Sequence, residues 1–183
     1  MKLERLHTTA TLLAHDRGLH DTSMALIAKR AQIAVGTIYL YYPSKDHLFG
    51  ELLARYYSYL NSLMQDPTPE IDFEAHLTAQ FNLLKTALLG DATAFGLFLQ
   101  LRQLKSFANH ARTEQDLFEQ KLAKLMEPGR MQVLLKNLST RCLGILFFEQ
   151  ICAQARYELD HPADPLLESK GLLEELCINS LLK

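Results

Sequence analysis

The segment from Thr22 to Lys45, TSMALIAKRAQIAVGTIYLYYPSK, constrains the fold more than any other part of the 183-residue sequence. Ala28, Ile33 and Ile38 recur at spacings that place them on the inner sides of two short helices joined by a tight turn. The outer side of the second helix then carries Thr37, Tyr39 and Tyr41, with Lys45 just beyond it. We therefore predict a helix-turn-helix whose second helix presents hydroxyls and aromatic rings at the surface.

The run from Gly18 to Leu48 resembles the DNA-binding domain of the tetracycline-repressor (TetR) family of transcriptional regulators. It contains I-A-x-x-A, G-T-I-Y and Y-P-S-K without interruption and at the family's spacing, and it covers about the first quarter of the chain. The resemblance implies an all-α fold. It further implies an N-terminal three-helix helix-turn-helix DNA-binding domain over residues 1–47, followed by a C-terminal helical ligand-binding and dimerisation domain over residues 48–183.

The same resemblance makes Val35 to Tyr41 the recognition helix, which lies in the DNA major groove. It implies that Val35, Gly36 and Thr37 face base edges, and that Tyr39, Tyr41 and Lys45 contact the phosphate backbone. Gly36 lets the backbone approach the DNA closely, and the methyl groups of Val35 and Thr37 can rest on a thymine methyl. Thr22 and Ser23 can cap the helix that begins directly after them, or they can donate to a DNA phosphate. Both therefore belong to the predicted DNA-binding set.

The turn between the two helices departs from the family pattern at Gln32, where the family usually has Gly. If Gln32 adopts the left-handed backbone conformation, strain of about 1 kcal/mol is expected.

Helical periodicity continues to the end of the chain. Ser44 is placed to cap a helix from Lys45 to about Met64, and two prolines mark a break over residues 65–70. We predict the later helices as follows: one ending at Gly90, one capped by Asp91 and carrying Phe95 to Phe107, one with a Thr113–Asp116 capping box that stops near Pro128, one from Ser139 to Leu159, and one from Leu166 to Leu181.

The middle helices are rich in phenylalanine, which favours an apolar or aromatic small-molecule effector. The predicted ligand-binding residues are Phe73, His76, Phe81, Phe95, Phe98 and Phe118. For each of them, ordinary packing in the protein core is at least as good an interpretation.

The last two helices carry apolar residues on nearly all sides, and Gly144 would allow a close approach between helices. Such helices must be covered on more than one side, either by their own core or by a second subunit. The family resemblance, together with the two-fold symmetry expected of a helix-turn-helix binding site, favours a homodimer through these two helices.

The charge distribution agrees with a nucleic-acid contact at the N-terminal end only. The first 64 residues hold 7 Lys or Arg against 5 Asp or Glu, whereas the rest holds 12 against 16. Because the basic excess is small, binding would also need hydroxyls, backbone amides and two subunits. There is no long apolar run and no signal-peptide pattern, so we expect a cytoplasmic protein with no membrane partner.

Known catalytic and cofactor motifs are absent from the sequence, and its three cysteines form no C-x-x-C pair. We therefore predict no cofactor, no metal and no catalytic residues. The favoured hypothesis is a ligand-responsive repressor that binds a palindromic double-stranded DNA operator as a homodimer and is released by a small molecule. A helical protein–protein adaptor and, less favoured, an all-α enzyme stay open as alternatives.

Overall fold

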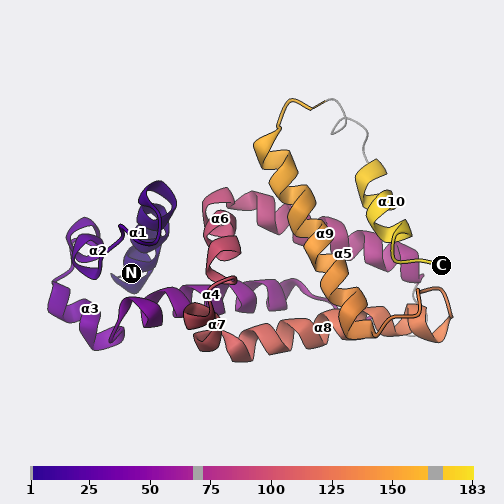
Figure 1. Cartoon of the computed structure of the whole chain (residues 1–183), viewed down its shortest axis with the longest axis horizontal. Coiled ribbons are helices and arrows are strands. Elements are labelled where there is room, and N and C mark those ends of the chain that lie inside the picture. Colours follow the sequence, from indigo (N-terminus) through magenta and orange to yellow (C-terminus); the bar gives the residue numbers. More distant parts are fainter. Residues whose placement is uncertain (1, 68–71, 165–170) are drawn as a thin grey trace. The chain divides into compact units, whose positions relative to one another are not determined.

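The computed structural model describes residues 2–67, 72–164 and 171–183, and over these residues the fold is helical throughout (Figure 1). The only strand-like feature among them is an isolated antiparallel bridge between Leu135 and Leu182. The predicted all-α fold is confirmed. Within the described ranges, every helix is too short or too polar to cross a membrane.

The chain divides into two compact units. The first comprises Met1–Tyr57 and Asp91–Gln115, and the second comprises Ser58–Gly90 and Asp116–Lys183. The helices in chain order are α1 (Lys2–Arg17), α2 (Met24–Ala31), α3 (Val35–Tyr41), α4 (Lys45–Leu63), α5 (Phe73–Gly90), α6 (Ala92–Leu101), α7 (Lys105–His110), α8 (Arg112–Met131), α9 (Thr140–Asp160) and α10 (Leu172–Asn179). Both α4 and α8 contribute residues to each unit.

Short polar side chains start several of these helices, because each accepts a hydrogen bond from an amide that the first helical turn leaves without a partner. The bonds run from Leu26 N to Ser23 Oγ, from His47 N to Ser44 Oγ, from Ala94 N to Asp91 Oδ1 and from Cys142 N to Ser139 Oγ. The predicted caps at Ser23, Ser44 and Asp91 are thus confirmed, as is the predicted helix start at Ser139.

Aromatic side chains hold α6 and α7 in the first unit. The ring of Phe98 stacks on Tyr56 at a centroid distance of 4.5 Å and meets Tyr57 edge-on at 5.2 Å. Phe49 of α4 and Phe107 of α7 lie 6.1 Å apart. The two compact units divide inside α4, after Tyr57. The predicted boundary between a DNA-binding domain (1–47) and an effector-binding and dimerisation domain (48–183) stays a prediction.

Two helix boundaries differ from the prediction. The helix that begins after Asp91 ends at Leu101, and Phe107 belongs to the separate helix α7. Helix α8 begins at Arg112, so Thr113 lies inside it and does not cap it.

Helix α8 also continues past Pro128 to Met131, whereas the sequence predicted a stop there. Pro128 lies in the last turn, where the loss of its amide removes a single helical hydrogen bond. Its neighbour Gly129 is buried, and a Cβ at this position would collide with the ring of Phe73. This close packing holds the last turn of α8 in place.

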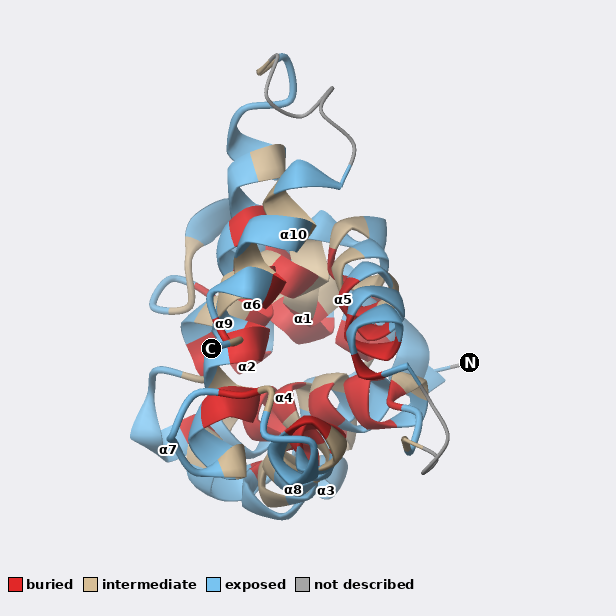
Figure 2. Ribbon diagram, turned by 90° about the vertical axis from the view of Figure 1, so that its right-hand side faces the viewer, coloured by how far each residue is buried: buried red, intermediate tan, exposed pale blue. Residues whose placement is uncertain are grey.

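In the second unit, α5 packs against α9 and α10. Figure 2 shows the division of α5 into a buried and an exposed side. A Cβ at Gly144 of α9 would lie 2.7 Å from the backbone of Leu122, so the glycine allows the predicted close approach of two helices. Phe81 and Phe147 add an edge-to-face contact at 5.9 Å.

A partly buried ion network joins the same three helices. Lys85 Nζ lies 3.2 Å from Glu158 Oε1 and 2.7 Å from Glu174 Oε1. Burial by itself lowers the pKa of Lys85, but the hydrogen bonds to the two carboxylates outweigh it and raise that pKa.

The last helix, α10, begins at Leu172 after Gly171, whose φ is +87°. The predicted start of this helix at Leu166 falls outside the residues that the structure describes.

Candidate DNA-binding surface

The angle between α2 and α3 is set by the turn that joins them. Gln32 has φ 54° and ψ 46°, the left-handed conformation expected for it. Its amide donates to the carbonyl of Lys29 at 3.3 Å, and the amide of Ile33 donates to the carbonyl of Ala28 at 3.0 Å. These two bonds define a Schellman motif, which ends α2 and turns the chain into α3 within three residues.

Helix α3 has one buried side chain, that of Ile38, which is 0% exposed. The remaining residues of α3 are exposed, apart from the half-buried Thr37. Because only the side chain of Ile38 is buried, the rest of α3 is open to an incoming molecule. Four of the predicted contact residues on α3 are exposed: Val35, Gly36, Tyr39 and Tyr41.

Leu40 of α3 is 83% exposed, and sequence reasoning did not include it. Only the position of Ile38, which the packing fixes, shows that Leu40 points outward. An exposed leucine in this position can contact a thymine methyl or a sugar.

Thr22 does not lie on this surface, which corrects the prediction that it contacts phosphate. Its side chain is 0% exposed, and its hydroxyl donates to the carbonyl of Gly18 at 2.8 Å. The hydroxyl therefore closes the loop between α1 and α2. Ser23, by contrast, is exposed and caps α2.

Lys45 is half-buried, and its ammonium donates to the carbonyls of Leu19 and, at 3.4 Å, of His20. It thus connects the start of α4 to the loop before α2. A lysine has three ammonium protons, so a phosphate contact by Lys45 stays a prediction. Two further cations, Lys29 and Arg30 in the last turn of α2, are exposed. The sequence did not identify them as candidate DNA contacts, because their spacing does not distinguish them from other surface cations.

The C-terminal end of α3 is attached to α1. Tyr42 follows α3 directly, and its hydroxyl lies 2.7 Å from Nε2 of His7. Burial lowers the pKa of His7, and the nearby Arg55 lowers it further, whereas Glu4 opposes this shift. Burial likewise raises the pKa of Tyr42. Both groups are therefore uncharged at neutral pH.

The six predicted ligand-binding residues are all buried, and they fall in both units. Phe95 and Phe98 belong to the first unit, whereas Phe73, His76, Phe81 and Phe118 belong to the second. Within the second unit, the ring of Phe118 meets Phe148 edge-on at 4.7 Å. This packing is what ordinary core residues show, so a ligand role for these six residues stays a prediction.

His76 differs from the five phenylalanines because it carries a polar atom into the core. Its Nε2 is buried and has no hydrogen-bond partner among the described residues. Burial lowers the pKa of His76, and a backbone hydrogen bond involving Gln65 opposes this effect. A neutral imidazole in this position can donate to or accept from a polar group of a ligand.

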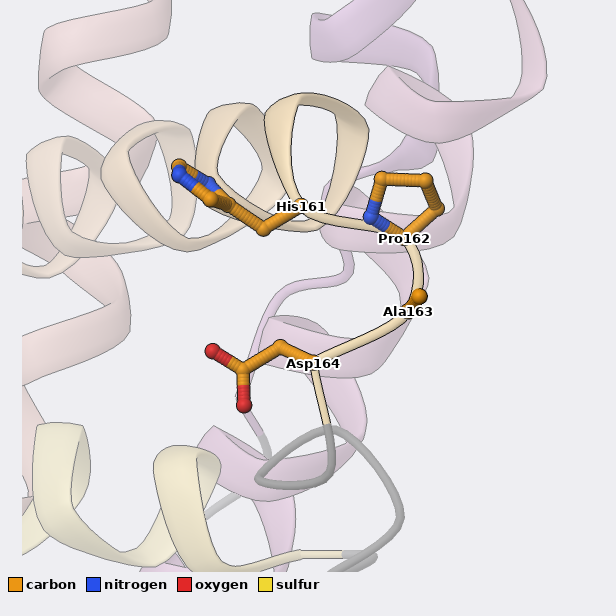
Figure 3. Close-up of a pocket in the computed structure, with 4 residues that line it drawn as sticks. All are labelled: His161, Pro162, Ala163 and Asp164. Atoms are coloured by element: carbon orange, nitrogen blue, oxygen red, sulfur yellow. The ribbon is translucent and has the colours of Figure 1, made fainter.

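A shallow surface depression follows α9 and is lined by His161, Pro162, Ala163 and Asp164 (Figure 3). None of the six predicted ligand-binding residues contributes to it. In the described part of the chain, no three His, Cys, Asp or Glu side chains are grouped to hold a metal ion.

The first unit thus has the architecture of helix-turn-helix DNA-binding proteins. Residues 6–52 match the sequence model of the bacterial regulatory proteins of the tetR family. The HTH-type transcriptional repressor KstR of Rhodococcus jostii is 38% identical over 64 residues, which are 35% of this chain and 30% of that repressor. An uncharacterised HTH-type transcriptional regulator of Haemophilus influenzae is 38% identical over 55 residues, or 29% of its length. These matched stretches span less than a third of either relative.

Solved structures match the whole chain in fold. A tetR family transcription regulator of Shewanella sp. PV-4 has a TM-score of 0.87 at 20% identity, covering 100% of this chain and 99% of that one. The transcriptional regulator FadR of Bacillus subtilis, solved in complex with stearoyl-CoA, has a TM-score of 0.72 at 18% identity and covers 96% and 97% of the two chains. Residues 6–52, which span most of α1 together with α2, α3 and the start of α4, thus carry the N-terminal sequence of the tetR family of bacterial regulatory proteins.

The left-handed backbone of Gln32 makes a prediction about stability. Replacement of Gln32 by glycine removes backbone strain of about 1–2 kcal/mol. Glycine also loses more conformational entropy on folding, which offsets part of this gain. Gln32→Gly should therefore raise the free energy of unfolding by up to about 1 kcal/mol. Urea unfolding measures this difference. The matched control is Lys29→Gly, an exposed helical position where glycine should lower stability by about 1 kcal/mol. Equal losses in both variants would show that Gln32 is not strained.

Proposed function

We propose that the protein is a transcriptional repressor that binds a palindromic DNA operator as a homodimer and leaves it when a small molecule binds. The observation that carries the proposal is the exposed side of α3, held by the burial of Ile38 and by the Schellman turn. The match of residues 6–52 to the tetR family and the similarity to KstR, which is a repressor, support it.

The chemistry of α3 suggests how DNA would be read. Its seven residues carry no Arg, Lys, Asn or Gln, so the bidentate bonds that distinguish guanine and adenine are not available from this helix. Val35 and Leu40 offer apolar contacts to thymine methyl groups. Tyr39 and Tyr41 offer phenolic hydroxyls to phosphates, and the amides at the start of α3 add further donors. Specificity would then come from apolar contacts and from DNA shape.

The proposed homodimer would form through α9 and α10. Leu146, Ala153 and Tyr157 follow one another at helical spacing on the exposed side of α9, and Leu172 and Leu176 do so on α10. Exposed leucines and a tyrosine in such stripes are the composition found at the centres of subunit interfaces. A C2 dimer would also place two copies of α3 on one operator with matching symmetry.

The proposed effector would bind in the second unit, among Phe73, Phe81 and Phe118, with one polar group against His76. Because these side chains are buried, the effector would displace some of them from their present contacts. We propose that this rearrangement changes the position of α4, which has residues in both units, and so affects DNA binding. FadR of Bacillus subtilis is solved in complex with stearoyl-CoA, which makes acyl-CoA thioesters the first probes to test.

Removing exposed side chains of α3 should weaken DNA binding while the protein stays folded. We expect Tyr39→Ala and Leu40→Ala each to lower the affinity for a site selected from genomic fragments by about 10- to 100-fold, since a lost contact costs about 1–3 kcal/mol. Fluorescence anisotropy at several salt concentrations measures the DNA affinity. The control is Leu12→Ala on the exposed side of α1, which should leave the affinity unchanged. Wild-type affinity in both α3 variants would exclude α3 as the DNA-reading helix, and no preference among DNA sequences would favour an adaptor.

Charged substitutions on α9 and α10 should separate the subunits. Sedimentation velocity should give the mass of two chains for the wild type and of one chain for Leu146→Lys and Leu176→Lys, because an unpaired charge would be buried in the interface. Leu104→Lys, at an exposed leucine outside these two helices, is the control and should remain a dimer. A wild-type protein that sediments as a single chain while it binds DNA would contradict the proposed assembly.

An effector should stabilise the wild type more than a variant that lacks the polar group of His76. Stearoyl-CoA and a panel of apolar and aromatic carboxylates are the probes in a thermal-shift assay, in which a ligand at 100 times its Kd adds about 2.7 kcal/mol of stability. His76→Leu should weaken binding of an active compound about fivefold, the effect of one lost hydrogen bond. His110→Leu, at an exposed histidine, should not. An equal affinity in His76→Leu and wild type would remove His76 from the site.

A further inference from the structure

The hydrogen bond between His7 and Tyr42 joins two helices at a sensitive point. His7 lies in the first half of α1 and is 8% exposed, and Tyr42 is the C-cap residue that follows α3. The ring centroids are 5.8 Å apart with an angle of 59° between the planes, so the 2.7 Å contact from Nε2 to the phenolic oxygen is made at the ring edges. This polar side-chain contact links the end of α3 to α1.

Helix α3 depends on such outside contacts. It has seven residues and begins without a side-chain cap at Ala34. A helix of this length is not stable by itself, because nucleation is costly and few internal hydrogen bonds follow. Ile38 fixes the middle of α3, and Tyr42, whose amide donates to the carbonyl of Ile38 at 2.8 Å, fixes its end. A movement of the Tyr42 ring is therefore transmitted to the last turn of α3, which includes Tyr39, Leu40 and Tyr41.

The second ring nitrogen of His7 shows which form of the imidazole fits this site. Nδ1 is buried and has no hydrogen-bond partner among the described residues. A bare lone pair is tolerated there better than a buried N–H, so the proton lies on Nε2, which donates to the Tyr42 hydroxyl oxygen. Protonation of His7 would put a charged N–H on Nδ1 with no acceptor, in a buried position.

The charged groups around the pair add to this effect. Burial is the main influence on His7; Arg55 of α4 disfavours its cationic form, and Glu4 of α1 favours it. On the Tyr42 side, Glu51 and Arg55 of α4 act in opposite directions. Helix α2 contributes the exposed cations Lys29 and Arg30, and α6, which also packs on α1, has no ionisable residue.

We propose that His7 is a positioning residue for DNA binding, and that its neutral imidazole holds the end of α3 in place through Tyr42 so that protonation of His7 releases α3 and weakens DNA binding. The proposal rests on the proposed DNA-binding function of α3. The protein would then bind its operator less well in an acidified cell.

The direction of the pH effect follows from thermodynamic linkage. Because the folded protein lowers the pKa of His7 below its ordinary value of about 6.5, the contribution of His7 to stability is complete above that pH. It is lost progressively as the pH falls through the lowered value. Any other gain of positive charge as the pH falls acts in the opposite sense, because it strengthens DNA binding. A comparison with a variant of His7 separates the two effects.

The experiment measures DNA affinity from pH 8 to pH 5.5 for wild type, His7→Gln and Tyr42→Phe, with circular dichroism at each pH to confirm folding. Glutamine can donate to the Tyr42 hydroxyl but does not titrate, so His7→Gln should keep its affinity at pH 8. The affinity ratio of wild type to His7→Gln should then fall about tenfold between pH 8 and pH 5.5, as the wild type loses the contribution of neutral His7. Tyr42→Phe keeps the ring but loses the bond, and it should bind less tightly already at pH 8. His15→Gln, the same substitution at an exposed histidine of the same helix, is the matched control.

Parallel pH profiles for wild type and His7→Gln, or unchanged affinity in Tyr42→Phe, would overturn the proposal while leaving the DNA-binding function intact. If no variant binds DNA at any pH, the proposed function fails, and NMR still tests the linkage. The amide signals of Tyr41 and Tyr42 should titrate together with the His7 ring in wild type and should be unaffected by pH in His7→Gln. Amide signals that titrate alike in both proteins would overturn the linkage itself.

Discussion

The orientation of α3 depends above all on the burial of Ile38. A seven-residue helix has no stable orientation by itself, and one fully buried side chain fixes which side faces the protein. The Schellman turn at Gln32 fixes the angle of approach, and Tyr42 fixes the far end through His7. The exposed positions of Val35, Leu40 and Tyr41 follow from these three constraints. The exposed surface of α3 is thus determined by the contacts that α3 makes with the rest of the first unit.

Much of the fold could be predicted from local sequence signals. Ser23, Ser44 and Asp91 cap helices where the sequence placed caps, because a cap is an interaction over three residues. The failures are tertiary in origin. The break after Leu101 has no proline or glycine beside it, and it reflects the packing of Phe98 and Phe107 on α4. The continuation of α8 through Pro128 depends on Gly129 fitting against Phe73, a contact between residues far apart in the sequence.

The candidate site could be predicted in its location but not in all of its residues. Thr22 and Ser23 are adjacent and chemically similar, yet one is buried in a loop and the other is exposed at a helix start. Leu40 was missed because a leucine in an amphipathic pattern suggests the core, and only the three-dimensional position of Ile38 shows which side it faces. The effector residues are the least determined by sequence, since a buried phenylalanine in a core and one beside a ligand have the same pattern.

Hydroxyl-radical footprinting of the protein on a selected genomic site tests the central claim most directly, because it reports where α3 lies on the DNA. The account predicts two protected regions on one side of the duplex, with centres about 34–36 Å apart, as two symmetry-related copies of α3 in successive major grooves require. A single protected region, or protection without two-fold symmetry, would contradict it.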